Sequence, residues 1–287
     1  MIELRSGSTI ASIDPVRGGR LGSLTVGRRE VIVRPNDDDD RSIYWGSFLM
    51  APWAGRVAGG ILAWNGARVE LPRNEEGHAI HGLVADNAWG VDAVGCCSAS
   101  LSCRIGPESW PFGATVRQTF EIAEDNLTIA AELCGDRPMP AAIGWHPWFS
   151  RVDVDPRVTL GAAEVLETRG LIPTGRRIAV DAQTDLRDGP PVCERGLDHV
   201  YPDAPSPAIA RWPDFELAVE FGPPLSTVVV HSREHAFCLE PQTAWPDAVA
   251  LEANGIPGTG LVALPAGEPL RAEMTLRWRT LEPETPR

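Results

Sequence analysis

Two residues of this chain are placed for proton transfer, a histidine near the middle and a glutamate closer to the C-terminus. His146 lies in the segment 142–149, AIGWHPWF, and Pro147 biases it toward extended backbone. Its imidazole can exchange a proton near neutral pH. Glu240 precedes Pro241 among apolar neighbours, at a predicted strand end where burial would raise the pKa of its carboxyl. Taken singly, His146 is better explained as a core histidine and Glu240 as a surface carboxylate at a turn.

Three further residues could anchor a polar ligand. Arg56 lies in the glycine- and proline-rich segment 46–60, which is predicted to be a loop. Its planar guanidinium suits sugar hydroxyls or a carboxylate, although it could equally tie the loop to a backbone carbonyl. His81 follows His78 by three positions, which without other ligands is a weak metal signal.

The third residue, Asp198, belongs to the long segment 189–203, which is predicted to be irregular. Long structured loops in β proteins are often functional, so Asp198 and the adjacent His199 are candidate site residues. Their alternative roles are a turn cap and a surface ring.

A zinc-peptidase pattern, H-x-x-E-H, occurs at His231, Glu234 and His235. That chemistry needs both histidines on one helical face, whereas the flanking segments predict strand, turn and strand. We therefore predict no metal site. The run Asp37–Asp40 is predicted to be a solvated loop, with a small chance of a cation site.

The elements that would position these residues are strands. Apolar alternation is clear in 115–122 and 126–133, and Asn65-Gly66 marks a hairpin. Further strands are predicted at 2–13, 20–33, 225–230, 236–239 and 270–279, and the segment 169–175 is predicted to be loop. Helical periodicity is nearly absent, and no repeat or linker divides the chain. The prediction is one all-β domain spanning 1–287, a large antiparallel β-sandwich.

Composition narrows the partners and the compartment. The 287 residues are 43% hydrophobic and 23% charged, with a formal net charge of −13, which disfavours nucleic acid and anionic membranes as partners. All 26 basic residues are arginine, so no lysine is available for a Schiff base. No signal peptide or membrane span is evident, and the six cysteines lack CxxC spacing. We expect free thiols and a cytoplasmic protein.

Taken together, these segments resemble the aldose 1-epimerase (galactose mutarotase) family. The family's motifs occur in family order over nearly the whole chain: PWAGRV at 52–57 with Gly59-Gly60, His81-Gly82, GWHPWF at 144–149, LDH at 197–199, and LEPQT at 239–243 with Pro246-Asp247-Ala248. The resemblance implies an antiparallel β-sandwich that interconverts the anomers of a sugar without a cofactor. It also implies a small-molecule aldose as partner, and we expect a monomer or homodimer.

The resemblance also implies a role for each matching residue. Arg56 corresponds to the family's sugar-binding arginine, His81 to a substrate-binding histidine, and Asp198 to an aspartate that holds sugar hydroxyls. His146 corresponds to the proposed general acid and Glu240 to the proposed general base. Such a pair needs a raised carboxyl pKa and an imidazole pKa near neutrality.

The chain departs from the family pattern at two positions. Gly55 stands where an asparagine often precedes the arginine, and Leu83 where a second glycine often follows His-Gly. These departures leave the preferred sugar open. A hexose-6-phosphate 1-epimerase would need a cation cluster, for which Arg176 and Arg177 are candidates. A carbohydrate-binding protein without catalysis is the remaining alternative.

Overall fold

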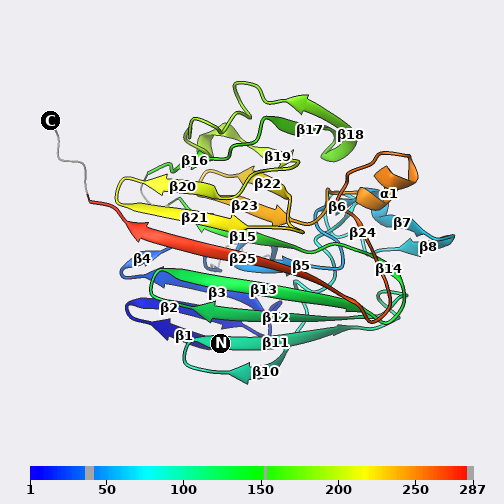
Figure 1. The fold of residues 1–287 in the computed structure, drawn as a ribbon, viewed down its shortest axis with the longest axis horizontal. Coiled ribbons are helices and arrows are strands. Elements are labelled where there is room, and N and C mark those ends of the chain that lie inside the picture. The colour runs from blue at the N-terminus through cyan, green and yellow to red at the C-terminus, as the bar shows by residue number, and fades with distance from the viewer. Residues whose placement is uncertain (36–41, 152–153, 283–287) are drawn as a thin grey trace.

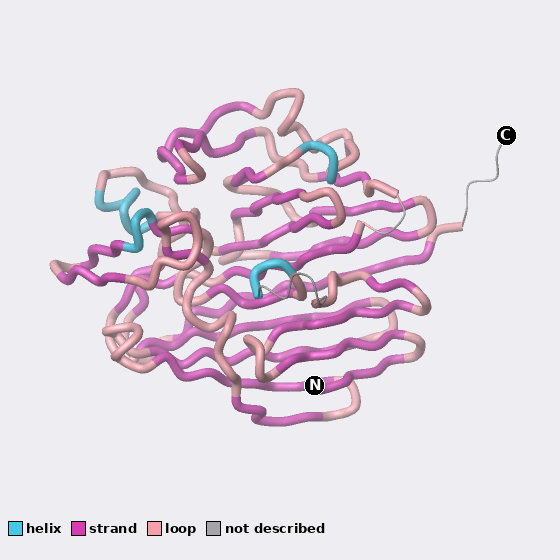
Figure 2. Tube along the Cα trace, turned by 180° about the vertical axis from the view of Figure 1, so that it is seen from behind, coloured by secondary structure: helices cyan, strands magenta, loops and turns pink. Residues whose placement is uncertain are grey.

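The computed structural model of the chain describes residues 1–35, 42–151 and 154–282. Two large antiparallel sheets lie face to face, as Figure 1 shows from the front and Figure 2 from behind. This arrangement confirms the predicted all-β sandwich. The acidic run Asp37–Asp40 lies outside the described residues.

Nine of the described strands form the back sheet, whose centre carries the segment around His146. Its order is β1 (Ile2–Ser6), β2 (Thr9–Asp14), β3 (Arg20–Val26), β5 (Ser47–Met50), β15 (Gly144–Ser150), β23 (Ala236–Gln242), β22 (Thr227–Ser232) and β19 (Asp198–Tyr201), with β4 (Arg29–Glu30) beside β3. Strands that are distant in sequence therefore meet at its centre. In particular, β15 pairs with β5 on one side and with β23 on the other.

Eight described strands form the front sheet. Its order is β10 (Gly90–Val94), β11 (Ser98–Ile105), β12 (Ala114–Ile122), β13 (Asn126–Gly135), β25 (Pro269–Thr280), β21 (Phe215–Phe221), β20 (Ala208–Trp212) and β16 (Arg157–Thr159). Burial alternates residue by residue along β12 and β13, as the sequence pattern predicted. Because side chains of a strand point alternately to its two faces, one face of this sheet packs on the core and the other meets water.

The central strands of the back sheet are different, because both of their faces are buried. Every residue of β23 is buried, and so are six of the seven residues of β15. One face of β15 packs into the sandwich core, where the indole N–H of Trp145 donates to Gln118 Oε1 of β12 at 2.9 Å. The opposite face carries His146 and Trp148, and it is covered by loops and short ribbons rather than by the front sheet.

The other described strands form four two-stranded ribbons that, with a few short helices, are separate from the two large sheets (Figure 1). The ribbons are β6 (Arg56–Val57) with β9 (Ala79–Ile80), β7 (Ile61–Trp64) with β8 (Ala67–Glu70), β14 (Met139–Ala141) with β24 (Val262–Leu264), and β17 (Glu164–Arg169) with β18 (Ile172–Ala179). The helices are η1 (Ser42–Tyr44), η2 (Ala58–Gly60), η3 (Cys193–Arg195) and α1 (Ala248–Ala253). None of the described helices has the length and apolar character needed to cross a bilayer.

Several local predictions need correction. The segment 169–175, predicted to be loop, is the turn and second strand of the β17–β18 hairpin. Strand β5 lies inside the predicted loop 46–60, and β19 lies inside the predicted irregular segment 189–203. Glycine and proline flank these strands closely, so local composition masked them. β5 and β19 pair with strands far along the chain, whereas β18 pairs with the adjacent β17. The Asn65-Gly66 hairpin is confirmed as the β7–β8 turn.

Candidate active site

The register of the back sheet brings His146 and Glu240 together. The pairings of Gly144 with Gln242 and of Trp148 with Cys238 place His146 of β15 directly opposite Glu240 of β23. Cross-strand neighbours share a face of the sheet, so both side chains project onto the covered outer face. The strand continues beyond Glu240 to Gln242, so Glu240 lies within β23 rather than at the predicted strand end.

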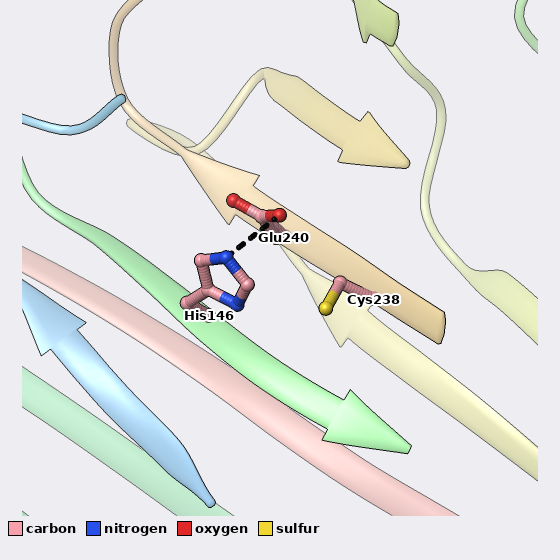
Figure 3. A group of neighbouring side chains, drawn as sticks. All are labelled: His146, Cys238 and Glu240. Carbon is pink, nitrogen blue, oxygen red and sulfur yellow. Dashed lines mark ion pairs between the residues drawn. The ribbon is translucent and has the colours of Figure 1, made fainter. Parts of the chain in front are cut away.

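The two side chains point toward each other in Figure 3. His146 Nε2 lies 3.3 Å from Glu240 Oε1, and the two side chains are only 6% and 3% exposed. The amide of Gln242 donates to the other carboxyl oxygen of Glu240 at 3.3 Å. The imidazole and the carboxyl are thus in direct contact, and a proton can pass between them.

Aromatic rings enclose the imidazole of His146 on both faces. The Phe48 ring stacks on it at 4.8 Å between centroids, and the Trp148 ring lies 5.3 Å away on a tilted plane. Behind Phe48, the buried guanidinium of Arg20 lies 5.0 Å from the ring centroid and donates to the carbonyls of Trp45 and Ala85. This column fixes the ring plane of His146 and excludes water from its faces.

This enclosure shifts the pKa values of Glu240 and His146 in the directions that disfavour their charged forms. Burial raises the pKa of Glu240 well above its ordinary value, and the nearby Asp198 carboxylate raises it further. Burial lowers the pKa of His146 well below its ordinary value, and the charges of His81 and His231 act in the same direction. The raised carboxyl pKa agrees with the expectation from the sequence. The expected near-neutral pKa of His146 does not hold.

Arg56 reaches the same face from the β6–β9 ribbon. Its Nη1 lies 3.9 Å from Asp198 Oδ2, and its Nη2 lies 3.5 Å from Glu76 Oε2. A buried aspartate, Asp247, anchors this ribbon: its backbone N–H donates to the carbonyl of Arg56 at 2.7 Å, and its carboxylate accepts from the N–H of Ala58 at 3.1 Å. The backbone of Arg56 is therefore fixed, and its guanidinium is flanked by two carboxylates.

His81 follows directly after β9 in an unusual backbone conformation. Its φ is +63°, in the left-handed region that residues other than glycine seldom adopt. Its N–H donates to the carbonyl of Gly55 at 3.0 Å, and its ring meets that of His146 edge to face at 4.8 Å. At the next residue, Gly82, a Cβ would lie 2.1 Å from the carbonyl oxygen of Ala51. Only glycine fits there, and it allows the turn that aims His81 inward.

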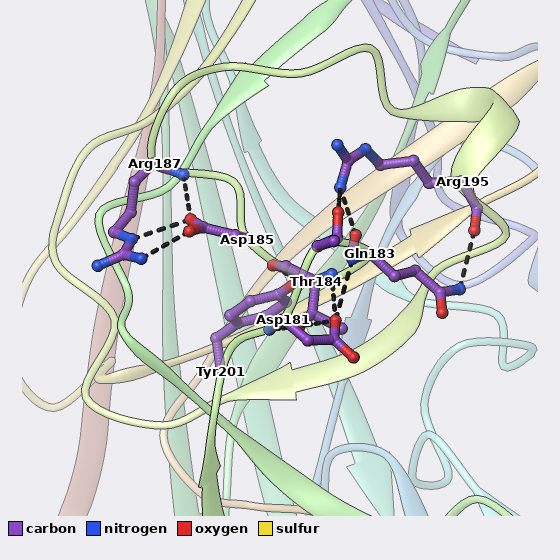
Figure 4. Close-up of polar contacts among 8 residues, drawn as sticks. Asp181, Gln183, Thr184, Asp185, Arg187, Arg195 and Tyr201 are labelled. Carbon is purple, nitrogen blue, oxygen red and sulfur yellow. Dashed lines mark hydrogen bonds and ion pairs between the residues drawn. The ribbon is translucent and has the colours of Figure 1, made fainter.

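Asp198 is the first residue of β19, at the far edge of the back sheet. The preceding loop is fixed by polar contacts around Asp181 and Thr184, shown in Figure 4. Tyr201, at the end of β19, donates from its hydroxyl to the carbonyl of Thr184 at 2.8 Å. The partner of Asp198 in β22 is His231, which shares its face of the sheet. These contacts set the position from which Asp198 faces Arg56.

All five residues predicted from the sequence line one pocket of about 190 Å³. The lining residues that carry polar or aromatic groups are Tyr44, Arg56, Glu75, Glu76, His81, His146, Trp148, Thr168, Asp198, His231, Glu240 and Gln242. The sequence reading missed His231 and Gln242 as pocket residues. Alternation along β23 would have placed Gln242 on the face of Glu240, but His231 was considered only as part of the zinc-peptidase pattern.

The zinc-peptidase pattern is split by the fold. His231 lies in β22 and faces the pocket, whereas the His235 side chain lies in the following turn and is 86% exposed. Within the described part of the chain, the group of possible metal ligands is His146, Cys238 and Glu240, whose ligand atoms lie up to 4.8 Å apart (Figure 3). Tetrahedral zinc ligands lie about 3.5 Å apart, so this group is wider than a closed zinc site.

Comparison with known proteins identifies the family of this chain. A family model described as aldose 1-epimerase matches residues 1–277. The chain belongs to the aldose 1-epimerase family. It is 24% identical over 262 residues to the uncharacterized protein YphB of Escherichia coli K12, which covers 86% of this chain and 88% of YphB.

Solved structures share the aldose 1-epimerase fold at lower identity. An Escherichia coli K12 protein provisionally described as an aldose 1-epimerase superposes with a TM-score of 0.86 at 22% identity, covering 98% of this chain and 99% of that one. The GalM/aldose epimerase homologue from C. elegans gives a TM-score of 0.84 at 19% identity, covering 98% and 99%. At these identities the likeness establishes the fold.

The aldose 1-epimerase framework also gives a physical reason for one departure from the family motifs. A Cβ at Gly55 would lie 2.6 Å from Cγ of Pro246, and the φ of Gly55 is +65°. An asparagine at position 55 would need this proline to move. The packing of Gly55 on Pro246 thus replaces a polar side chain beside Arg56 with a tight backbone contact.

Proposed function

We propose that the pocket interconverts the α and β anomers of a free aldose by general acid–base ring opening and closure. The observation that carries this proposal is the 3.3 Å contact between His146 Nε2 and Glu240 Oε1, buried in a pocket that also contains Arg56, His81 and Asp198. Mutarotation needs one group to take the anomeric proton and another to protonate the ring oxygen. A carboxylate and an imidazole in contact supply both groups.

The proposed roles follow from the position of each side chain. Glu240, as a carboxylate, takes the proton of the anomeric hydroxyl while imidazolium His146 donates its proton to the ring oxygen. The C1–O5 bond breaks, and O1 becomes the carbonyl oxygen of the open chain. After rotation about C1–C2, the same two transfers run in reverse on the other face of the carbonyl. Arg56, His81 and Asp198 hold the hydroxyls during this rotation.

The direction of the two pKa shifts fits this cycle. Burial disfavours charge on both groups, so it favours the form of the pair in which the proton lies on Glu240 and His146 is neutral. Ring opening leaves the same distribution behind, a neutral carboxyl and a neutral imidazole. The reactive tautomer carries that proton on His146 instead, and the attraction between the two charged groups supports it in the buried site. No proton is gained or lost over a full turnover.

The charges around the pocket favour a free sugar over a phosphorylated one. Among the described residues that line the pocket, Arg56 is the one cation, and Glu76 and Asp198 already flank it. The arginines considered for a phosphate lie on β18 and are engaged elsewhere: Arg176 pairs with Glu167, and Arg177 with Asp203. A phosphate would therefore enter a pocket rich in carboxylates without an unpaired cation to receive it.

The direct test is polarimetry of freshly dissolved α-glucose and α-galactose with and without the protein, followed by glucose 6-phosphate. Faster anomer exchange of a free hexose is expected, with little acceleration for the phosphate ester. Preference for the ester would move the assignment to a hexose-6-phosphate 1-epimerase. Sugar binding without faster exchange would leave a carbohydrate-binding protein. Treatment with EDTA is expected to leave the exchange rate unchanged.

A further inference from the structure

His231 is a pocket residue for which the acid–base mechanism above has no role. It lies on β22, and the register pairs it with Asp198 of β19 on one side and Cys238 of β23 on the other. Its side chain is 28% exposed and lines the same pocket as His146 and Glu240. A partly exposed imidazole at the wall of a buried polar pocket is available to a ligand.

Two neighbours fix the orientation of this ring. Its Nδ1 lies 3.8 Å from Asp198 Oδ2, and its plane meets the Trp148 ring edge to face at 5.4 Å between centroids. The carboxylate favours a proton on Nδ1, because that tautomer directs an N–H dipole at the negative charge. The other ring nitrogen, Nε2, is then an acceptor, and no hydrogen bond from the described residues occupies it.

The carboxylate of Asp198 lies between the side chains of Arg56 and His231. Arg56 Nη1 lies 3.9 Å from Asp198 Oδ2, the same oxygen that faces His231. The three side chains therefore present a donor, an acceptor and a second acceptor along one wall of the pocket that His146 also lines. A sugar carries hydroxyls on adjacent carbons, and each hydroxyl can donate and accept, so such a wall can distinguish the direction of neighbouring hydroxyls.

We propose that His231 is a substrate-binding residue, oriented by Asp198 through Nδ1, whose Nε2 accepts a hydrogen bond from a ring hydroxyl of the aldose. This inference rests on the proposed anomer exchange for the identity of the ligand, but it concerns binding rather than proton transfer. Burial lowers the pKa of His231 below its ordinary value, which keeps Nε2 unprotonated near neutral pH. A purely structural role, packing against Trp148, would require only the ring.

The test separates these two roles with three variants. His231→Phe keeps an aromatic ring on Trp148 but removes both nitrogens, and His231→Gln keeps a hydrogen-bonding group. His235→Gln is the matched control, because His235 belongs to the same sequence pattern but is exposed on the turn. Binding of glucose and galactose is measured by titration of tryptophan fluorescence, and anomer exchange by polarimetry.

We expect His231→Phe to raise the Kd for at least one of the two sugars by about 5- to 10-fold, the loss of one neutral hydrogen bond, with a smaller change in kcat. The ratio of the two Kd values should also change, because the lost contact reads one hydroxyl. His231→Gln should restore most of the affinity, and His235→Gln should match the wild type. In wild-type protein, ¹⁵N NMR should show the Nε2 resonance of His231 shifting when sugar is added.

Wild-type affinity for both sugars in His231→Phe, together with an unmoved Nε2 resonance, would overturn the inference. A loss of kcat at unchanged Kd would also overturn it, since it would place His231 in the chemical step. A wild-type protein that binds neither sugar contradicts it as well. A wild-type protein that binds sugar but does not accelerate exchange would refute the proposed function, while the binding data would still decide the role of His231.

Discussion

Two carboxyl groups of this protein each contact a nitrogen-containing side chain, one pair at the surface and the other buried. On the front sheet, Arg104 donates to Asp136 at the water-exposed surface, and this partner lowers the pKa of Asp136. At the centre of the back sheet, Glu240 contacts His146 at 3.3 Å, yet the pKa of Glu240 is raised well above its ordinary value. The cationic partner determines the direction of the pKa shift for the surface carboxyl, whereas desolvation determines it for the buried carboxyl.

The sheets explain the difference. The outer face of the front sheet is open to water, so charged pairs such as Arg104–Asp136 keep their hydration there. The outer face of β15 and β23 is covered by ribbons and loops, so the Glu240 carboxyl and the His146 imidazole on that face are shielded from water. In a buried carboxyl–imidazole pair, a proton can move from one group to the other with little reorganisation of solvent. Such a pair is therefore suited to acid–base catalysis.

The largest expected effect comes from removing the basic site of the buried pair. Glu240→Gln keeps the shape of the side chain but cannot take a proton, so kcat for anomer exchange should fall at least ~10²-fold. Sugar binding, measured by titration, should largely survive, because Arg56, His81 and Asp198 are expected to supply it. Near wild-type exchange in this variant would show that Glu240 is not the base, and Asp198 would be the next carboxylate to test.

The companion variant His146→Asn removes the other half of the pair and should cost a similar factor in kcat. The double variant should lose much less than the product of the two single losses, because both residues act on one reaction. Losses that multiply would instead indicate independent roles. Each rate is measured by polarimetry or by NMR exchange at saturating sugar.

The second effect concerns the backbone that aims His81 into the pocket. Gly82→Ala places a Cβ against the Ala51 carbonyl oxygen, at 2.1 Å before relaxation, so we expect about 3 kcal/mol of destabilisation in urea unfolding. Gly59→Ala is the control, because Gly59 has a similar positive φ of +61° but open space around its Cβ position. That variant should lose only about 1 kcal/mol. Equal losses would mean that backbone conformation, and not the contact with Ala51, makes Gly82 necessary.

A third effect is a loss of stability in mild acid that comes from buried imidazoles. Burial lowers the pKa of His81 from 6.5 to about 3, so below pH 6.5 the unfolded chain binds a proton that the folded state excludes. Stability should therefore fall as the pH drops from 6.5 toward 3, by about 2 kcal/mol at pH 5 from His81.

The measurement is urea unfolding of the wild type and of His81→Asn at pH 7 and pH 5. Asparagine tolerates the left-handed backbone at this position but does not titrate. The variant should lose less stability on acidification than the wild type. An identical pH dependence in both proteins would show that His81 is not the group responsible.

The smallest effect is expected at the surface pair. Arg104→Gln removes the cation beside Asp136 where both side chains are about half exposed, so water replaces the lost contact. Anomer exchange should not change, and the unfolding midpoint should shift only slightly, less so at high salt. A large loss of stability would contradict the view that pairing on the front sheet contributes little.

Local patterns in the sequence were sufficient for the fold class and for much of the meander. Alternation predicted β12 and β13, and Asn65-Gly66 predicted the β7–β8 turn, because side-chain periodicity and turn chemistry act over a few residues. They failed at β5 and β19, where glycine- and proline-rich composition masked strands whose partners lie far along the chain. They also failed at β18, where the same composition masked a hairpin with the adjacent β17.

The sequence by itself determined which side chains could transfer a proton or hold a hydroxyl, and the family motifs ordered them. Only the tertiary structure decided that His146 lies against Glu240, that Asp198 faces both Arg56 and His231, and that the couple resists charge. The physical reason is that contact and desolvation depend on register between β15, β23, β22 and β19, of which only β22 and β23 are close together in the sequence. Spacing along the chain does not encode that register, and burial of the outer face arises only when the ribbons cover it.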